Sequence, residues 1–165
     1  MARAFVSIGS NIDRERNVRD AARRLAAEFD DVEFSPTYET DAVGFEGDPF
    51  YNLVAGLTTQ LMPDELHDRL HEIEAEMGRD QNWPSFAPRG IDLDLLLYDD
   101  LVLKSAAVTI PRSDIEEYAF VLKPLADLVP DLEHPSRRLR LAEMVARRRE
   151  ECDALERVVL EGLGQ

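Results

Sequence analysis

Cysteine, basic residues and long apolar runs are scarce in this sequence. The single cysteine, Cys152, argues against an internal disulfide framework and against a metal site built from several cysteines. No run approaches the ~18 apolar residues that a membrane-spanning helix needs, and the N-terminus lacks the apolar stretch of a secretory signal. We therefore expect a cytoplasmic protein that has no membrane partner.

Basic residues are outnumbered, since 19 Lys and Arg stand against 34 Asp and Glu and give a formal net charge of −15. Nucleic acid requires a basic footprint, so this charge argues against nucleic acid as a partner. A free nucleotide needs only a local cluster of cations and stays possible. At 165 residues the chain fits one domain, residues 1–165, with a core of its own.

The periodicity of the apolar residues predicts an α+β fold. Strand patterns cover residues 4–8, 32–38, 51–59 and 91–98, and amphipathic helices are expected over residues 14–29 and 63–78. This β-α-β-β-α-β order is the split βαβ pattern of ferredoxin-like folds. In such folds an antiparallel sheet carries its helices on one face and leaves the other face free for a site.

The second half of the chain is expected to extend this unit with short elements. Extended pieces are predicted at residues 101–103 and 108–111, followed by a helix that Ser113 caps and that Pro124 interrupts. A C-terminal helical extension is then expected from about residue 141 to 160, loosely attached to the rest.

The segment from Ile91 to Leu95 alternates apolar and acidic residues, the period of a strand with one buried face. Asp92 and Asp94 then point the same way, and two such charges repel unless a cation lies between them. Mg²⁺ binds carboxylate oxygens and often completes its shell with substrate phosphates. Acidic residues on a solvated strand face are also common, but Asp is depleted in strands, so at this point both interpretations stay open.

Other polar motifs are weaker candidates for chemistry. The turn Gly9-Ser10-Asn11 lies between a strand and a helix, where backbone N–H groups can bind phosphate, but it lacks the P-loop pattern and a plain turn is favoured. His67 and His71 have the spacing of paired metal ligands without the Glu of a His-Glu-x-x-His motif, which favours a solvated helix face.

Phe50, Asn52 and Phe120 could together bind a planar heterocycle. An aromatic ring stacks on the face of such a ligand, and an amide can donate and accept hydrogen bonds at its edge. The alternative is that Phe50 and Phe120 are ordinary core residues. No histidine and acid accompany a serine or Cys152 in a recognisable nucleophile set, so any chemistry is expected to rest on metal and phosphate.

Several of these segments occur in the order and spacing of one family. They are residues 4–11, the run Phe50-Tyr51-Asn52, Gly78-Arg79, residues 87–98 with Pro88-Arg89-Gly90-Ile91-Asp92-Leu93-Asp94, and residues 119–125. Together they resemble 6-hydroxymethyl-7,8-dihydropterin pyrophosphokinase, an enzyme of folate synthesis, over about residues 4–145. The resemblance implies a ferredoxin-like fold and transfer of the β,γ-diphosphate of ATP to the hydroxymethyl group of the pterin, with release of AMP.

The resemblance also implies a role for each matching residue. Asp92 and Asp94 would hold two Mg²⁺ ions that bridge the phosphates of ATP. The remaining expectations are catalytic roles for Arg79, Arg89 and Arg112, pterin contacts for Thr40, Val43, Phe50, Asn52 and Phe120, and nucleotide contacts for Glu74, Leu95, Arg79 and Arg112. We expect a monomer whose partners are ATP and the pterin.

The departures from the family pattern fall among its basic positions. Gln81, Ser85 and Tyr118 stand where relatives often carry arginine, and Arg112 replaces a common histidine. Charged hydrogen bonds to phosphate contribute about 1.5–3 kcal/mol each, so a non-catalytic pterin- or nucleotide-binding module is the alternative to the kinase. A Mg²⁺-dependent phosphotransferase with another acceptor is a third interpretation, and Phe50 and Asn52 speak against it.

Overall fold

The structure is a computed structural model, and it describes residues 1–41, 47–78 and 90–163. A six-stranded sheet forms its centre, with β1 (Ala2–Ser10), β2 (Asp30–Phe34), β3 (Thr37–Thr40), β4 (Phe50–Thr59), β5 (Asp92–Tyr98) and β8 (Glu156–Val158). The strand order is β5-β1-β4-β3-β8, β2 also pairs with β4, and each pairing is antiparallel. A small hairpin joins β6 (Leu103–Lys104) to β7 (Thr109–Ile110). The α+β class predicted from the sequence is confirmed.

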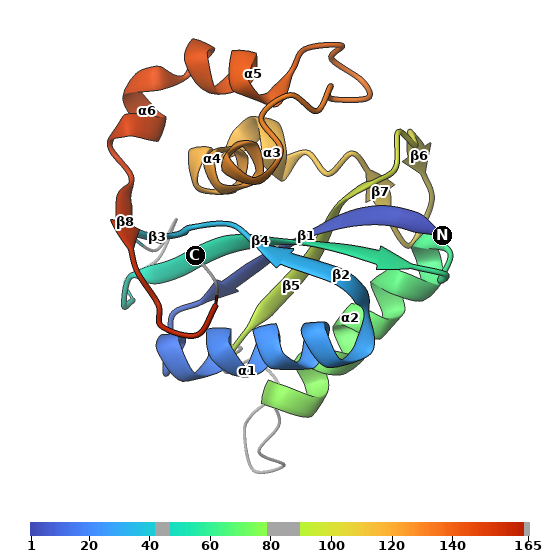
Figure 1. Cartoon of the computed structure of the whole chain (residues 1–165), viewed down its shortest axis with the longest axis vertical. Helices are drawn as coiled ribbons and strands as arrows, with labels where there is room; N and C mark the ends of the chain where they lie inside the picture. Colours follow the sequence, from blue (N-terminus) through green and yellow to red (C-terminus); the bar gives the residue numbers. More distant parts are fainter. Residues whose placement is uncertain (42–46, 79–89, 164–165) are drawn as a thin grey trace.

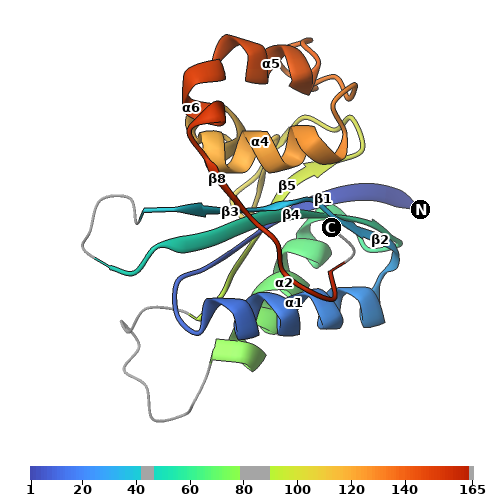
Figure 2. The ribbon, with the colours of Figure 1, turned by 60° about the vertical axis from the view of Figure 1, so that its left-hand side comes forward.

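Helices cover both faces of this sheet (Figures 1 and 2). One face carries α1 (Arg14–Glu28) and α2 (Pro63–Gly78). The other carries α3 (Asp114–Glu117) and α4 (Ala119–Leu128), with α5 (Leu141–Arg147) and α6 (Arg149–Asp153) above them. The two helices of the predicted βαββαβ unit share one face, but the expectation that the other face stays free is wrong, because α3 and α4 lie on it. The second face is partly covered, so a site on it has helical walls.

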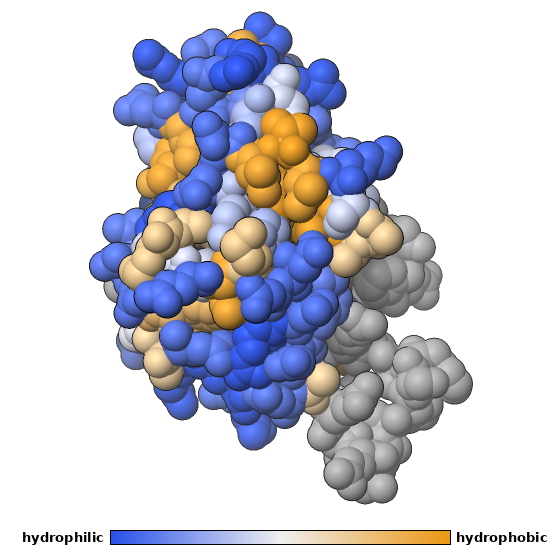
Figure 3. Space-filling view, turned by 90° about the vertical axis from the view of Figure 1, so that its right-hand side faces the viewer, coloured by the Kyte–Doolittle hydropathy of each residue, from blue (hydrophilic) through white to orange (hydrophobic). Residues whose placement is uncertain are grey.

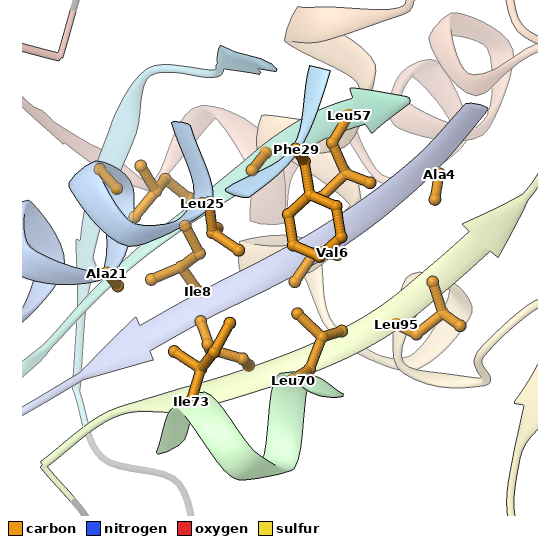
Figure 4. Close-up of a cluster of buried hydrophobic side chains, with 14 of the residues drawn as sticks. Ala4, Val6, Ile8, Ala21, Leu25, Phe29, Leu57, Leu70, Ile73 and Leu95 are labelled. Carbon is orange, nitrogen blue, oxygen red and sulfur yellow. The ribbon is translucent and has the colours of Figure 1, made fainter. Parts of the chain in front are cut away.

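The main core lies between the sheet and helices α1 and α2, as Figure 4 shows. Leu25 of α1 and Leu70 and Ile73 of α2 repeat at helical spacing and are at most 1 % exposed. They pack on the alternate residues of the strands that face them, among them Val6 and Leu95. The remaining residues of each strand therefore point to the opposite face.

A second apolar cluster fixes α4 on that opposite face. Phe5, Val54 and Leu96 from three strands pack against Leu122 and Leu125 of α4, and α5 joins through Leu141 and Met144. Pro124 lies inside α4 rather than ending it. The apolar residues on both sides of the proline bury the helix firmly enough to tolerate the missing backbone N–H.

The C-terminal segment differs from the single helix expected over residues 141–160. Helix α5 ends at Arg147, α6 ends at Asp153, and the chain then forms β8 on the outer edge of β3. Leu160 and Leu163 are buried and belong to the main core. Because β8 satisfies backbone groups that an edge strand leaves unpaired, the pairing favours a strand over a continued helix.

The surface is largely hydrophilic on the face that Figure 3 shows, with a few apolar patches. Among the described residues, large hydrophobic side chains are well exposed at Met1, Met62, Val102 and Val159. No helix in the described part of the chain has the length and apolar character needed to cross a membrane.

Candidate active site

The strand register places the polar residues of three strands side by side on the face opposite the main core. Gly9 of β1 pairs with Asn52 of β4 on one side and with Asp92 of β5 on the other. Two residues away on β1, Ser7 pairs with Asp94. Because successive side chains alternate between faces, the two aspartates share the face of Asn52 while Leu93 between them is buried in the core.

These residues form the floor of a pocket of about 270 Å³. The edge near β3 contributes Thr40, Asp41 and Phe50, and the α3–α4 layer contributes Asp114, Tyr118, Phe120 and Val121. The pocket thus has aromatic side chains from two different elements. Three carboxylates, Asp92, Asp94 and Asp114, form its acidic end on the β5 side, and Asp41 lies on the β3 side. A mixture of apolar walls and a few convergent polar groups is typical of small-molecule sites.

Asn52 is held in place before any ligand arrives. Its side chain is 8 % exposed, and its Nδ2 donates a hydrogen bond to Oγ1 of Thr40 at 2.9 Å. The β3–β4 pairing positions both residues, because Thr40 pairs with Phe50 and Tyr38 pairs with Asn52. With one N–H engaged, the amide still has an acceptor oxygen and a second N–H for a ligand edge.

Glycine at position 9 keeps the floor low. A Cβ atom at Gly9 would lie 3.5 Å from Oδ1 of Asn52 and 3.9 Å from Cδ1 of Phe50. Both are ordinary van der Waals distances, so packing within the protein does not require the glycine. The absent side chain instead leaves space between Asn52 and Asp92 that a flat ligand can occupy.

The α4 side of the pocket carries a pair of stacked rings. The centroids of Tyr118 and Phe120 are 4.9 Å apart, and their planes differ by 20°. Tyr118 precedes the first residue of α4, and its carbonyl accepts hydrogen bonds from the N–H groups of Val121 and Leu122. Offset stacking of this kind stabilises the orientation of both rings. One face of Phe120 is therefore supported from within the protein.

Arg112 provides positive charge at the acidic end of the pocket. Its Nη2 lies 3.8 Å from Oδ1 of Asp94, and its Nε donates to Oδ2 of Asp114 at 2.9 Å. Burial lowers the pKa of the guanidinium, but the hydrogen bond to Asp114 and the charges of Asp94, Asp114 and Asp92 outweigh it and raise the pKa. Arg112 therefore stays protonated beside the carboxylates.

Asp92 and Asp94 fit a site for Mg²⁺. Both are partly exposed on the same face of a rigid strand, and both line the pocket. Oxygen donors are the ligands that Mg²⁺ prefers, and it retains positions for water or phosphate when a protein supplies only one or two carboxylates. The guanidinium of Arg112 beside Asp94 shows that this end of the pocket attracts a cation.

The predicted site residues fall into three groups. Val43, Arg79 and Arg89, together with the departures Gln81 and Ser85, lie outside the described residues. Of the described residues, Thr40, Phe50, Asn52, Asp92, Asp94 and Phe120 line one pocket, and Arg112 reaches its acidic end through Asp94 and Asp114, whereas Glu74 and Leu95 lie outside it.

Glu74 and Leu95, expected at the nucleotide, do not line this pocket. The Leu95 side chain is 2 % exposed and belongs to the main core, so contact with a nucleotide in the pocket is left to its backbone. Glu74 of α2 is 7 % exposed, and its Oε2 accepts a hydrogen bond from the backbone N–H of Leu93 at 3.1 Å. Its carboxylate therefore supports the stretch of β5 that carries Asp92 and Asp94.

Sequence reasoning missed Asp41 and Asp114 as pocket residues and treated Tyr118 only as a lost basic position. Asp114 follows Arg112 by two residues, which was an available signal for a local ion pair. The stacking of Tyr118 on Phe120 has the same i, i+2 spacing, but these residues straddle a helix start. That geometry was not visible in the periodicity.

Comparison with known proteins places this pocket in context. The model of the family 7,8-dihydro-6-hydroxymethylpterin-pyrophosphokinase (HPPK) matches residues 5–130. The chain is 41 % identical over 151 residues to 2-amino-4-hydroxy-6-hydroxymethyldihydropteridine pyrophosphokinase of Pseudomonas aeruginosa, covering 87 % of this chain and 90 % of that protein. Identity is 34 % over 145 residues with the protein of the same name from Aquifex aeolicus, with the same coverage of 87 % and 90 %.

Among solved structures, the fold is similar to an HPPK-DHPS crystallised in complex with substrates, with a TM-score of 0.70 at 11 % identity. The alignment covers 91 % of this chain but 46 % of that one. The wild-type HPPK-DHPS of Plasmodium falciparum gives a TM-score of 0.67 at 15 % identity, covering 95 % and 47 %. This chain thus spans about half the length of those two proteins, and at such low identity the likeness concerns the fold.

Proposed function

The chain belongs to the 7,8-dihydro-6-hydroxymethylpterin-pyrophosphokinase family, and we propose that the pocket over β1, β4 and β5 is its active site. The protein is an ATP-dependent pyrophosphokinase of folate biosynthesis. It transfers diphosphate from ATP to 6-hydroxymethyl-7,8-dihydropterin and yields AMP and the pterin diphosphate. The observation that carries the site assignment is the convergence of Asn52, Phe50, Phe120 and the two β5 aspartates on one pocket.

The aromatic part of the pocket is the proposed pterin site. Phe50 and Phe120 would stack on the two faces of the bicyclic ring, while Asn52 and the backbone near Thr40 and Val43 would bind its polar edge. The Asn52–Thr40 hydrogen bond supports this role, because the amide is already oriented and loses little side-chain freedom when the ring binds. The space above Gly9 supports it as well.

The acidic end is the proposed site for the phosphates of ATP. Asp92 and Asp94 would hold Mg²⁺, and two ions are proposed. Bound Mg²⁺ would neutralise phosphate charge and align the β-phosphorus with the pterin hydroxyl. Arg112 would add positive charge on the same side, and Arg79 and Arg89 are assigned a similar role on the resemblance alone. Glu74 would act at the nucleotide only through the β5 backbone that it supports, as would Leu95 through its own main chain.

The transfer itself balances without a covalent enzyme intermediate. The hydroxymethyl oxygen of the pterin forms a bond to the β-phosphorus of ATP, and the bond from that phosphorus to the oxygen bridging to the α-phosphate breaks. AMP leaves with that oxygen, and the alcohol proton passes to solvent. Such a reaction depends mainly on alignment and charge neutralisation, which the two ends of the pocket are suited to provide.

Three broader assignments extend this proposal. The strand order β5-β1-β4 with β2 and β3 on the far side of β4 supports a ferredoxin-like topology, in which β2 and β3 act as one interrupted strand. We assign the protein to the cytoplasm, where ATP is available. A monomer is the third assignment that we propose.

The decisive experiment measures AMP formed from ATP and Mg²⁺ with and without 6-hydroxymethyl-7,8-dihydropterin. Asp94→Ala is compared with Asp100→Ala, which removes the same charge from an exposed position in the turn after β5. We expect pterin-dependent AMP formation in the wild type, a loss of about 100-fold or more in Asp94→Ala, and little change in Asp100→Ala. AMP formation that does not depend on the pterin, or that is unchanged in Asp94→Ala, would refute the active-site assignment. Tight pterin binding without turnover would favour a binding module.

A further inference from the structure

The ion pair between Arg112 and Asp114 lies at the rim of the acidic end, and we propose that Asp114 is a positioning residue for Arg112. In this role it keeps the guanidinium beside the phosphates of bound ATP. The inference rests on the proposed function, because it assigns the phosphates to this end of the pocket. Asp114 lines the pocket and touches Arg112 at 2.9 Å.

The backbone around Arg112 is fixed on both sides. Its N–H donates to the carbonyl of Leu96 at 3.0 Å, and its own carbonyl accepts from the N–H of Ile115 at 3.2 Å. Ile115 is fully buried in the second apolar cluster. The backbone of Arg112 is thus held by β5 and α3. The position of the guanidinium depends on the contacts that the side chain itself makes.

Two carboxylates lie near different nitrogen atoms of that charged end, Asp94 at Nη2 and Asp114 at Nε. Asp94 lies 3.8 Å away on the strand and Asp114 lies 2.9 Å away on the first turn of α3. The contact to Asp114 is a hydrogen bond, whereas the longer contact to Asp94 is mainly electrostatic. The arginine side chain is 40 % exposed and that of Asp114 is 24 % exposed, so the pair is partly open to solvent, and Asp114 lines the pocket.

The two contacts respond differently when substrate binds. The carboxylate of Asp94 is assigned to Mg²⁺, and a carboxylate that ligates Mg²⁺ attracts a neighbouring arginine less strongly. Asp114 is not assigned to the metal and retains its charge for Arg112. A long arginine side chain without such a partner populates many rotamers, and fixing it on a phosphate then costs entropy.

A positioning role of Asp114 can be distinguished from a general electrostatic effect, because the two predict opposite changes in ATP affinity when Asp114 is removed. ATP is an anion, so removing a negative charge from the pocket would by itself strengthen its binding. If Asp114 acts by positioning Arg112, its removal weakens ATP binding instead. In addition, the weakening requires Arg112, so it disappears when Arg112 is absent.

The test is calorimetric titration with Mg²⁺ and the ATP analogue that carries a methylene group between the α- and β-phosphates. The proteins are the wild type, Asp114→Asn, Arg112→Ala and the double variant, with Asp100→Asn as a control of equal charge change. We expect Asp114→Asn to bind the analogue about tenfold more weakly, Asp100→Asn to bind like the wild type, and Asp114→Asn to cause no weakening in the Arg112→Ala background.

Two further variants guard against a folding artefact. Asp114→Glu retains a carboxylate and is expected to keep most of the affinity, and Asp114→Ser provides a second removal with a residue that helix starts accept. Unchanged or tighter binding by Asp114→Asn, with a wild type that binds, overturns the positioning role and leaves the proposed function intact. A wild type that does not bind the analogue overturns the phosphate assignment itself.

Discussion

The floor of the pocket can be raised by one methyl group without disturbing the fold, through Gly9→Ala. The added Cβ would lie 3.5 Å from Oδ1 of Asn52 and 3.9 Å from Cδ1 of Phe50, which are unstrained distances. Gly9 also has no positive φ angle, so alanine adopts the same backbone. A compatible Gly-to-Ala change stabilises a protein by about 0.4–1 kcal/mol through the unfolded state. The melting temperature should therefore stay the same or rise.

Ligand binding should respond in the opposite way. A pterin ring above Gly9 would meet the new methyl group where the floor is now flat, and overpacking of this kind costs about 1–3 kcal/mol. That cost corresponds to a loss of roughly 5- to 150-fold in pterin affinity. Pterin binding can be followed by the fluorescence of the ligand during titration, and stability by thermal unfolding of the same samples.

A second glycine on a neighbouring strand provides the contrast. A Cβ at Gly56 of β4 would lie 2.7 Å from Nη2 of Arg3 and 3.1 Å from Cε1 of Phe5, and Gly56 does not line the pocket. Gly56→Ala should therefore gain no stability, and its folded form should bind the pterin with unchanged affinity. If Gly9→Ala binds the pterin as tightly as the wild type, the ring does not lie above Gly9 and the proposed orientation of the substrate is wrong.

Two further predictions concern buried polar groups away from the substrates. The hydroxyl of Tyr38 donates a hydrogen bond to Asp127, and burial together with this bond raises the pKa of Tyr38. Tyr38→Phe removes the donor and should lower the free energy of unfolding, measured in urea, by about 1.5–3 kcal/mol. An unchanged value would mean that Lys123 alone satisfies Asp127. Burial lowers the pKa of His134, whose Nδ1 accepts hydrogen bonds from two backbone N–H groups. The unfolded chain therefore binds the proton more readily, and the free energy of unfolding should fall as pH decreases below about 6.5. His134→Asn keeps an acceptor but does not titrate, so its melting temperature should depend less on pH in that range.

The sequence was informative where a local period determines which face a residue occupies. The alternation from Ile91 to Leu95 predicted that Asp92 and Asp94 share a face, and the structure places both on the pocket side with Leu93 in the core. The apolar stripes of α1 and α2 were predicted in the same way from helical spacing. The burial of Leu25 and Leu70 confirms them. In each case the information lies within a few neighbouring residues.

Local periods failed where distant segments determine the structure. The strand expected over residues 32–38 is divided into β2 and β3 at Ser35, whose N–H donates to the carbonyl of Val54 and whose hydroxyl accepts from the N–H of Val54. This irregularity depends on the partner strand. Likewise, residues 156–158 pair with β3 although the preceding pattern favoured a helix. The predicted helix after Ser113 is also divided, with α3 and α4 separated at Tyr118.

The pocket combines these two kinds of information. Its floor follows from strand alternation, because each residue that faces the ligand is the neighbour of one buried under α1 or α2. Its walls depend on α4, which contacts the sheet through residues far away in sequence, such as Val54 and Leu122. The Tyr38–Asp127 hydrogen bond joins β3, next to Thr40, to the same helix that carries Phe120. The distance between Phe50 and Phe120 is therefore determined by the tertiary fold. We expect substitutions of Tyr38 or Asp127 to change pterin affinity, although neither residue is proposed to touch the pterin ring.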